Sequence, residues 1–368
     1  MQNIEQMAAG RGLHVLVVSN HWEAKKASPS AGIFVDRQIE SLKEAGIIID
    51  TFDIGLGHSP LYLVRKWLEL RRSVRSLNPD LVHGRYGTIV GLLSAFAGRP
   101  AVVSFCGGDL LVGASISLMR QYIGFALSNL AALKAKRLIC VSEELRQALW
   151  WRRSRASVIP DGVDLRFYSP GPQEVARRQL RWELRHPIYL LNVRDDPTAK
   201  GLDLAVEVMQ IVRLRIPDAE LRIIENVEPA MMPLYYRAAD ALLCLSLSEG
   251  SPNVVKEALA CNLPVISTPV GDVRERLAGV QPSAVVARKA EAIAEKLLQI
   301  ARERKRSNGR ERVANLSLEN TARCVLEVYR AALPDRVGSK PGVSASGVKE
   351  DAIAGITDDA MLRELESS

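Results

Sequence analysis

The stretch SLSEGSPNVVKEALACNLPVISTPVGDVRE, residues 246–275, decides the fold of this chain. The apolar run at 241–247 is typical of a buried parallel strand that ends at a turn. Ser251 and Pro252 then predict a helix N-cap followed by proline at the first helical position. We expect this helix to stop at Asn262, which tolerates the left-handed conformation, and a second strand to cover 263–267. The stretch therefore predicts a strand–helix–strand unit of a parallel sheet.

Loops rich in small residues follow both predicted strands, at 248–252 and 268–271. Free backbone N–H groups and the positive end of a helix dipole favour an anion at such a place. Glu249 and Glu257 frame it, and on an ideal helix their separation corresponds to about 12 Å of rise. The two acids of a glycosidase lie only roughly 5 to 9.5 Å apart. We therefore interpret the two glutamates as ligands of hydroxyl groups, one on a sugar and one on a ribose.

The two glutamates, separated by seven residues, with GSPN after the first and PVIST after the second, resemble a motif of the group 1 family of retaining glycosyltransferases. The resemblance covers about residues 11–333. It implies an α/β protein of the GT-B fold, with two Rossmann-like, doubly wound domains facing each other across a cleft. It also implies sugar transfer from a nucleotide-diphosphate sugar, a UDP- or GDP-sugar, to an acceptor hydroxyl. Retention of configuration, with neither a metal nor another cofactor, is part of what the family implies.

The resemblance assigns roles to individual residues. Arg194 and Lys200 match the two cations that hold the donor diphosphate, Glu249 would bind sugar hydroxyls and Glu257 the ribose. Asp109 matches a further site position, although an aspartate that caps the following turn is an equal alternative. The expected donor-binding set also includes Gly32, Gly250, Ser251, Pro252, Asn253 and Val254. Gly32 alone is weak evidence, because any tight strand-to-helix turn favours glycine.

Two departures from the family pattern stand out. Cys106 occupies a position where many relatives carry a histidine near the donor sugar, so this chain either lacks that group or uses the thiol differently. After residues 221–224, one βα unit is missing or strongly shortened. This predicts a narrower second sheet, and the nucleotide base cannot be inferred from the family.

His83 ends the predicted strand 80–83, where a structural role is a commoner explanation than contact with substrate.

The length of 368 residues predicts two domains. We expect the following division of the chain: a disordered N-terminus at 1–11, an acceptor-side domain at 12–170, a nucleotide-sugar domain at 171–317, a helix crossing back to the first domain at 318–333, and a flexible tail at 334–368.

Composition limits the partners. Five scattered cysteines without a C-x-x-C pair argue against a disulfide framework or a zinc site, and the N-terminus lacks a signal-peptide core, so we expect a cytoplasmic protein. The net charge is +7, although the last 34 residues carry seven acids and four bases. With 5% aromatic residues, nucleic acid is the least favoured partner of this basic chain.

A basic amphipathic helix is predicted at 61–77. It either packs on the core with a solvated face or binds an anionic membrane peripherally, in which case the acceptor could be lipid-linked. A sugar or another hydroxyl compound is the other acceptor class, and the family points to cell-envelope or exopolysaccharide synthesis. Two other functions stay open, a non-catalytic nucleotide-sugar binder and a nucleotide-sugar epimerase.

Overall fold

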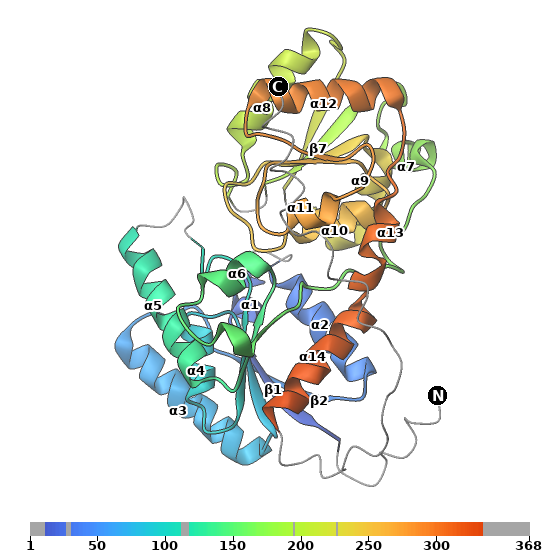
Figure 1. Ribbon diagram of the computed structural model, residues 1–368. Helices are drawn as coiled ribbons and strands as arrows, with labels where there is room; N and C mark the ends of the chain where they lie inside the picture. The colour runs from blue at the N-terminus through green and yellow to red at the C-terminus, as the bar shows by residue number, and fades with distance from the viewer. Residues whose placement is uncertain (1–11, 27–30, 112–117, 194–195, 226, 334–368) are drawn as a thin grey trace, which may run out of the picture. The chain divides into compact units, whose positions relative to one another are not determined.

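The structure, a computed structural model, describes residues 12–26, 31–111, 118–193, 196–225 and 227–333. The predicted N-terminal segment 1–11, the predicted tail 334–368 and Arg194 lie outside the described residues. Two parallel sheets with helices around them form the described part (Figure 1). This is the α/β architecture with two doubly wound sheets that the sequence predicts.

The first sheet has the strand order β2-β1-β3-β4-β5-β6. Its strands are β1 His14–Ser19, β2 Ile48–Asp53, β3 Leu81–Arg85, β4 Ala101–Phe105, β5 Arg137–Cys140 and β6 Ala156–Val158. Its helices are α1 His21–Ala24, α2 Ile33–Glu44, α3 Pro60–Leu77, α4 Ile89–Ala95, α5 Leu118–Lys134 and α6 Glu143–Ala148, followed by the 3₁₀ turn Arg153–Arg155. Strands β1, β3 and β4 are buried along their whole length, as expected for a parallel sheet that is covered on both faces.

Alternating side chains divide the core of this sheet between its two faces. Val15 and Val17 pack with α2 and α14, Leu318–Ala332, whereas Leu16 and Val18 pack with α3 and α4. Helix α5 covers the same face as α4, because the two helices are in contact. The outer layer of this face therefore consists of α3, α4 and α5 (Figure 1).

The second sheet has the order β11-β10-β9-β7-β8. Its strands are β7 Ile188–Asn192, β8 Glu220–Ile224, β9 Ala241–Cys244, β10 Val265–Ser267 and β11 Ala284–Val285. Its helices are α7 Gln173–Leu180, α8 Leu202–Arg213, α9 Met232–Ala238, α10 Asn253–Ala260, α11 Val273–Leu277, α12 Ala290–Glu303 and α13 Gly309–Val313, with 3₁₀ turns at Pro229–Met231 and Ala314–Leu316. The short connection after β8 leads directly to α9, which leaves β8 at the edge of a sheet with one strand fewer than the first, as the shortened segment predicts.

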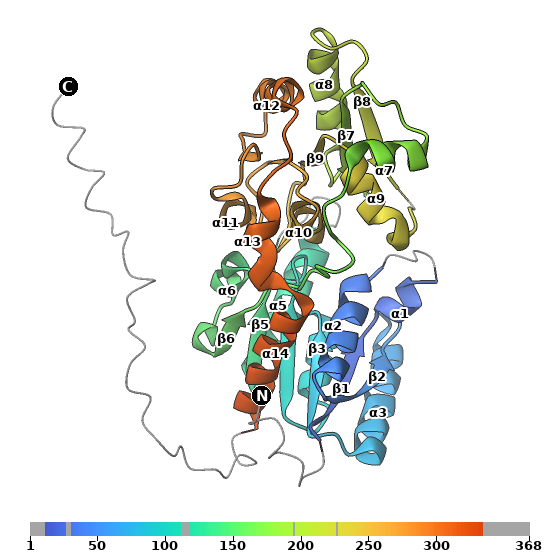
Figure 2. The ribbon, with the colours of Figure 1, turned by 90° about the vertical axis from the view of Figure 1, so that its right-hand side faces the viewer.

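Two segments of the chain connect the sheets and run side by side. The Val163 N–H donates to the Leu316 carbonyl at 2.8 Å, and Val163 forms a parallel bridge with Ser317. After this point α14 packs against α2, β4 and β5 of the first sheet (Figure 2). The Tyr329 hydroxyl on α14 lies 2.7 Å from Nδ1 of the fully buried His83, whose Nε2 lies 2.7 Å from the Ser104 hydroxyl. The surroundings of His83 thus agree with the structural alternative.

The sequence prediction for the central stretch is right at one helix end and wrong at the other. Asn262 has φ of 55° and follows the end of α10, as predicted. The N-cap, however, is Pro252 and not Ser251, and proline is not the first helical residue. The Ser251 hydroxyl instead donates to Asp272 at 2.8 Å and accepts from Lys256 at 3.1 Å. These tertiary partners replace the local cap.

Candidate functional site

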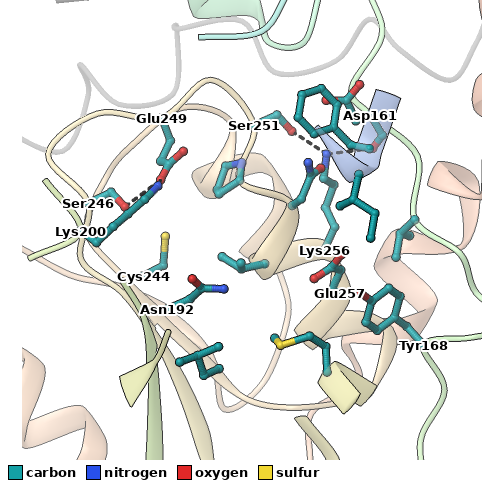
Figure 3. A pocket seen from close by; sticks show the side chains of 18 of the residues that line it. Asp161, Tyr168, Asn192, Lys200, Cys244, Ser246, Glu249, Ser251, Lys256 and Glu257 are labelled. Carbon is teal, nitrogen blue, oxygen red and sulfur yellow. Dashed lines mark hydrogen bonds and ion pairs between the residues drawn. The ribbon is translucent and has the colours of Figure 1, made fainter. Parts of the chain in front are cut away.

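A cavity of about 240 Å³ is lined by residues that surround both sheets. Figure 3 shows the lining residues of the second half of the chain and of the connecting segment. Ile33, Phe34, Arg37 and Cys106 line it from the first sheet. The second sheet contributes the following lining residues of the predicted set: Lys200, Glu249, Ser251, Pro252, Asn253, Val254 and Glu257. The cavity is slightly smaller than the usual range of about 300–1,000 Å³ for ligand pockets. Two ion pairs join residues that line it, Lys200 with Glu249 and Arg37 with Glu257.

The first of these ion pairs joins two predicted site residues. Lys200, which precedes α8, places its Nζ 2.5 Å from Oε1 of Glu249, and the Ser246 hydroxyl donates to the same oxygen at 2.7 Å (Figure 3). Gly201, with φ of 78°, permits this approach, because an added Cβ would lie 2.4 Å from the Leu245 carbonyl oxygen. The structure therefore brings the expected diphosphate cation and the expected sugar carboxylate into direct contact.

Gly250, in the loop between β9 and α10, lies against the loop that follows β4. A Cβ on this residue would lie 2.5 Å from the Cys106 carbonyl oxygen and 2.9 Å from the Val141 side chain. Gly271, with φ of 50°, packs against the Gly250 carbonyl in the same way. Gly250 is thus required by close backbone packing with Cys106 and Gly271.

Asn253 opens helix α10 and offers a polar atom without a partner. Its side-chain oxygen is buried and has no hydrogen-bond partner among the described residues. A buried amide that lacks partners costs free energy, so such an atom at a cavity wall is a candidate for a ligand contact. The N-terminus of α10 adds its dipole at the same place.

Lys256 was not among the predicted site residues. It is buried on α10, and its Nζ donates to the Asp161 carbonyl at 2.8 Å and to the Ser251 hydroxyl at 3.1 Å. Burial lowers the pKa of Lys256, and the charge of Asp161 opposes this shift. The Asp161 carboxylate in turn accepts from the buried Arg85 at 2.8 Å. Lys256 therefore attaches α10 to the segment that connects the sheets.

Glu257, the expected ribose ligand, is already engaged. Its Oε1 accepts from Arg37 at 2.8 Å and its Oε2 accepts from the Tyr236 hydroxyl at 3.0 Å. Arg37 also donates to the Tyr168 hydroxyl at 2.9 Å. Burial disfavours the charged guanidinium, but Glu257 and Tyr168 raise the pKa of Arg37 above its ordinary value. Sequence reasoning missed Arg37, Tyr168 and Tyr236, because each comes from a different part of the chain.

Asp109 lies behind the cavity and does not line it. Its carboxylate accepts the N–H groups of Gly87 and Gly107 at 2.8 Å and that of Cys106 at 3.1 Å. Burial raises the pKa of Asp109, and the backbone donors oppose that shift. This geometry is the turn-capping alternative, and it makes Asp109 a support of the loop that carries Cys106.

We expect Asp109→Asn to destabilise the protein. An amide has one acceptor oxygen in place of two, so at least one buried N–H group loses its partner, at a cost of about 1–3 kcal/mol. At about 2–4 °C per kcal/mol, the melting temperature should fall by several degrees. Thermal unfolding followed by circular dichroism measures this, with the exposed Asp218→Asn as a matched control. An unchanged melting temperature would show that the backbone donors find other partners.

Gly32 stands apart from the cavity-lining residues. It is the N-cap of α2 with φ of 61°, and an added Cβ would lie 2.4 Å from the His21 side chain. His21 itself is held by Ser19 at 2.8 Å and by Asp36 at 3.0 Å. The structure therefore explains this glycine by the tight turn, and it places the next residues, Ile33 and Phe34, at the cavity.

Cys106 lines the cavity next to Gly250. Burial raises the pKa of its thiol well above the ordinary value, with the charge of Arg85 opposing this shift. The thiol is therefore protonated at neutral pH and is a poor nucleophile.

We expect Cys106→Ser to retain most of its activity, because serine keeps the size of a side chain that only fills space. Steady-state rates compared with those of Cys324→Ser, a cysteine on α14, test this. A loss of more than about a hundredfold with unchanged stability would make the thiol part of the chemistry.

No group of three or more His, Cys, Asp or Glu side chains suited to a metal ion occurs in the described part of the chain.

Comparison with known proteins supports a family assignment for both halves. Residues 2–167 match the family model described as Glycosyltransferase Family 4, and residues 207–303 match the one described as Glycosyl transferases group 1. A D-inositol 3-phosphate glycosyltransferase of Segniliparus rotundus is 30% identical over 49% of this chain and 47% of its own length. The chain thus spans about half the length of this relative. A putative teichuronic acid biosynthesis glycosyltransferase, TuaC of Bacillus subtilis, is 24% identical over 75% of this chain and 86% of its own.

Among solved structures, HepE of Anabaena in complex with UDP superposes with a TM-score of 0.65. It is 15% identical and covers 87% of this chain and 100% of its own. At this identity the likeness shows the fold alone, which is GT-B.

Proposed function

Because this chain belongs to the family 4, group 1 glycosyltransferases, we propose that it transfers a sugar from a nucleoside-diphosphate sugar to an acceptor hydroxyl. The observation that carries the proposal is the contact between Lys200 and Glu249 beside the N-terminus of α10. A cation and a helix dipole suit the diphosphate, and the adjacent carboxylate suits the hydroxyls of the attached sugar. Glu257, eight residues on, would accept the ribose hydroxyls. Arg194, outside the described residues, stays the predicted second cation.

The reaction builds negative charge on the diphosphate as the bond to the anomeric carbon breaks. Lys200 and the backbone N–H groups at the start of α10 would stabilise this charge without a metal ion. UDP-sugars are the first donors to test, because the Anabaena protein was solved with UDP, and GDP-sugars follow. The Bacillus subtilis relative is described as a putative teichuronic acid biosynthesis glycosyltransferase, so a hydroxyl of a cell-envelope or exopolysaccharide precursor is the acceptor class we propose. The name of the Segniliparus rotundus relative makes inositol phosphate a further acceptor to test.

Retention of configuration is the stereochemical part of the proposal, and the state of the carboxylates supports it. Of the described residues that line the cavity, Asp161, Glu249 and Glu257 carry carboxylates, and each is paired with a cation. An inverting transfer needs a general base that contacts the acceptor hydroxyl, and these three carboxylates are each engaged with a cation of the protein. In a retaining transfer the departing phosphate oxygen takes the acceptor proton, while the acceptor oxygen bonds to the anomeric carbon on the same face.

Nucleoside-diphosphate release from a panel of UDP- and GDP-sugars tests the activity, in buffer with and without a metal chelator. We expect release that the chelator leaves unchanged. With an acceptor identified, we expect a transfer product whose anomeric configuration by NMR equals that of the donor. A non-catalytic binder would show a donor-dependent thermal shift without release. An epimerase would convert the donor sugar without any acceptor. A product of inverted configuration would contradict the stereochemical part alone.

A further inference from the structure

Helix α5 presents an unusual outer face. Nine of its positions are exposed, and seven of these are apolar and recur at helical spacing: Leu118, Met119, Tyr122, Ile123, Ala126, Leu130 and Leu133. The side chains near the start of the helix are the most accessible, with Met119 74% and Tyr122 72% exposed. A surface helix of a soluble protein normally turns polar side chains outward. Such an apolar stripe marks an interaction site.

Helix α3 has the same character at its start. Leu61 is 80% exposed, and Val64 and Leu68 are exposed as well, whereas only Leu70 and Val74 are fully buried. Three of the nine apolar side chains on this helix are therefore exposed, and all three lie in its first half. The helix packs on the core through Leu70 and Val74, as the core-packed alternative expects, and the exposed apolar side chains lie in addition to that packing.

The two helices belong to one continuous surface. The Trp67 indole on α3 donates to the Phe96 carbonyl at the end of α4, at 3.1 Å. The exposed Phe96 ring lies 5.8 Å from Nζ of Lys134 at the end of α5. Helix α4 packs against α5. We call the exposed outer side of α3, α4 and α5 the α3–α5 surface; these helices lie together on one face of the first sheet (Figure 1).

The three helices that form the α3–α5 surface are strongly basic. The three helices carry seven basic residues, which are Arg65, Lys66, Arg71, Arg72, Arg75, Arg120 and Lys134, against a single acid, Glu69. They thus hold a net charge of +6, out of +7 for the whole chain. Apolar and aromatic side chains among basic ones suit the interface of an anionic lipid bilayer, which takes apolar groups between its headgroups and attracts cations. No helix in the described part is long and apolar enough to cross a bilayer.

We propose that the α3–α5 surface docks this protein on anionic membranes. The apolar starts of α3 and α5 lie at the carboxyl edge of the first sheet, because each helix follows the end of a strand. Cys106, which follows β4, reaches the cavity from that same edge. A lipid-borne acceptor would thus meet the cavity at the membrane. This consequence rests on the proposed function, whereas membrane docking itself does not.

Co-sedimentation with vesicles tests the docking, without donor or acceptor present. We expect binding to phosphatidylcholine vesicles that contain phosphatidylglycerol, weakened by high salt, and much weaker binding to phosphatidylcholine alone. Two variants separate the components: Met119→Ser/Tyr122→Ser/Ile123→Ser removes the apolar stripe, and Arg72→Glu/Arg75→Glu reverses charge. Each should lower the partition coefficient by at least about tenfold.

Leu214→Ser/Arg215→Glu is the matched control, since it changes an exposed leucine and arginine after α8 of the second sheet. It should bind vesicles like the unchanged protein. Thermal unfolding verifies that all variants fold. The proposal is wrong if the protein binds neither kind of vesicle or binds both kinds equally. It is also wrong if the two variants bind vesicles as well as the unchanged protein does. A concentration-dependent dimer in gel filtration that the α5 variant abolishes would also overturn the proposal, because the surface would then belong to a second copy of the chain.

Discussion

Lys200→Ala should lower the turnover number by roughly 10²–10³, which is comparable to the loss of an oxyanion-hole donor. The ammonium group contacts Glu249 in the free protein, and the donor diphosphate would take over part of this contact. Its attraction to the diphosphate grows as negative charge develops, so the loss has to appear in turnover. The Michaelis constant for the donor should rise less than turnover falls.

Lys305→Ala, which removes an exposed lysine of the same half of the chain, is the matched control and should behave like the unchanged protein. Lys200→Arg retains the charge but changes its shape and reach, so it should recover part of the turnover. Hydrolytic release of nucleoside diphosphate serves as the assay until an acceptor is identified. If Lys200→Ala changes only the Michaelis constant, Lys200 binds the ground state and the transition state equally, and the proposed role in stabilising the leaving diphosphate is wrong.

The fold was accessible from the sequence because its signals are local. Alternating apolar runs and helical periodicities fix the order of strands and helices, and Asn262 ends α10 in the predicted left-handed conformation. Where a tertiary contact competes with a local one, the local interpretation fails. Ser251 has a good capping side chain, yet its hydroxyl bonds to Asp272 and Lys256.

The same difference between local patterns and tertiary contacts applies to the candidate site. The spacing of Glu249 and Glu257 and the resemblance of the loop before Lys200 to the family are both local patterns, and they identify these residues. Arg37 was not identified, because its partner Glu257 lies 220 residues further along the chain. The sequence contains only a weak indication that Lys256 belongs to the site. This lysine stands between Val255 and Glu257, in the buried part of α10. Only the structure shows that its partner is the Asp161 carbonyl.

Glu257 has two candidate roles, a ribose ligand and a purely structural group. Its ion pair with Arg37 allows experiments to distinguish them. As a ribose ligand, Glu257 would exchange the Arg37 and Tyr236 contacts for two ribose hydroxyls. As a structural group alone, it would tie α10 to α2 and leave the donor untouched. Both roles predict a less stable protein when Glu257 is removed, because the half-buried Arg37 then loses its counterion. Donor affinity is therefore the measurement that distinguishes them.

We expect Glu257→Ala to weaken donor binding by about tenfold to a hundredfold. Charge-assisted hydrogen bonds are worth about 1.5–3 kcal/mol each, but Glu257 has to give up its contacts with Arg37 and Tyr236 to bind the ribose, which offsets part of this free energy. Arg37→Ala should leave donor affinity unchanged or raise it, because it frees the carboxylate. The double variant should resemble Glu257→Ala. Isothermal titration calorimetry with the donor found by nucleotide release gives all three constants, and the exposed Glu295→Ala is the matched control. Unaltered donor affinity in Glu257→Ala, together with a lowered melting temperature, would leave Glu257 only as the tie between α10 and α2.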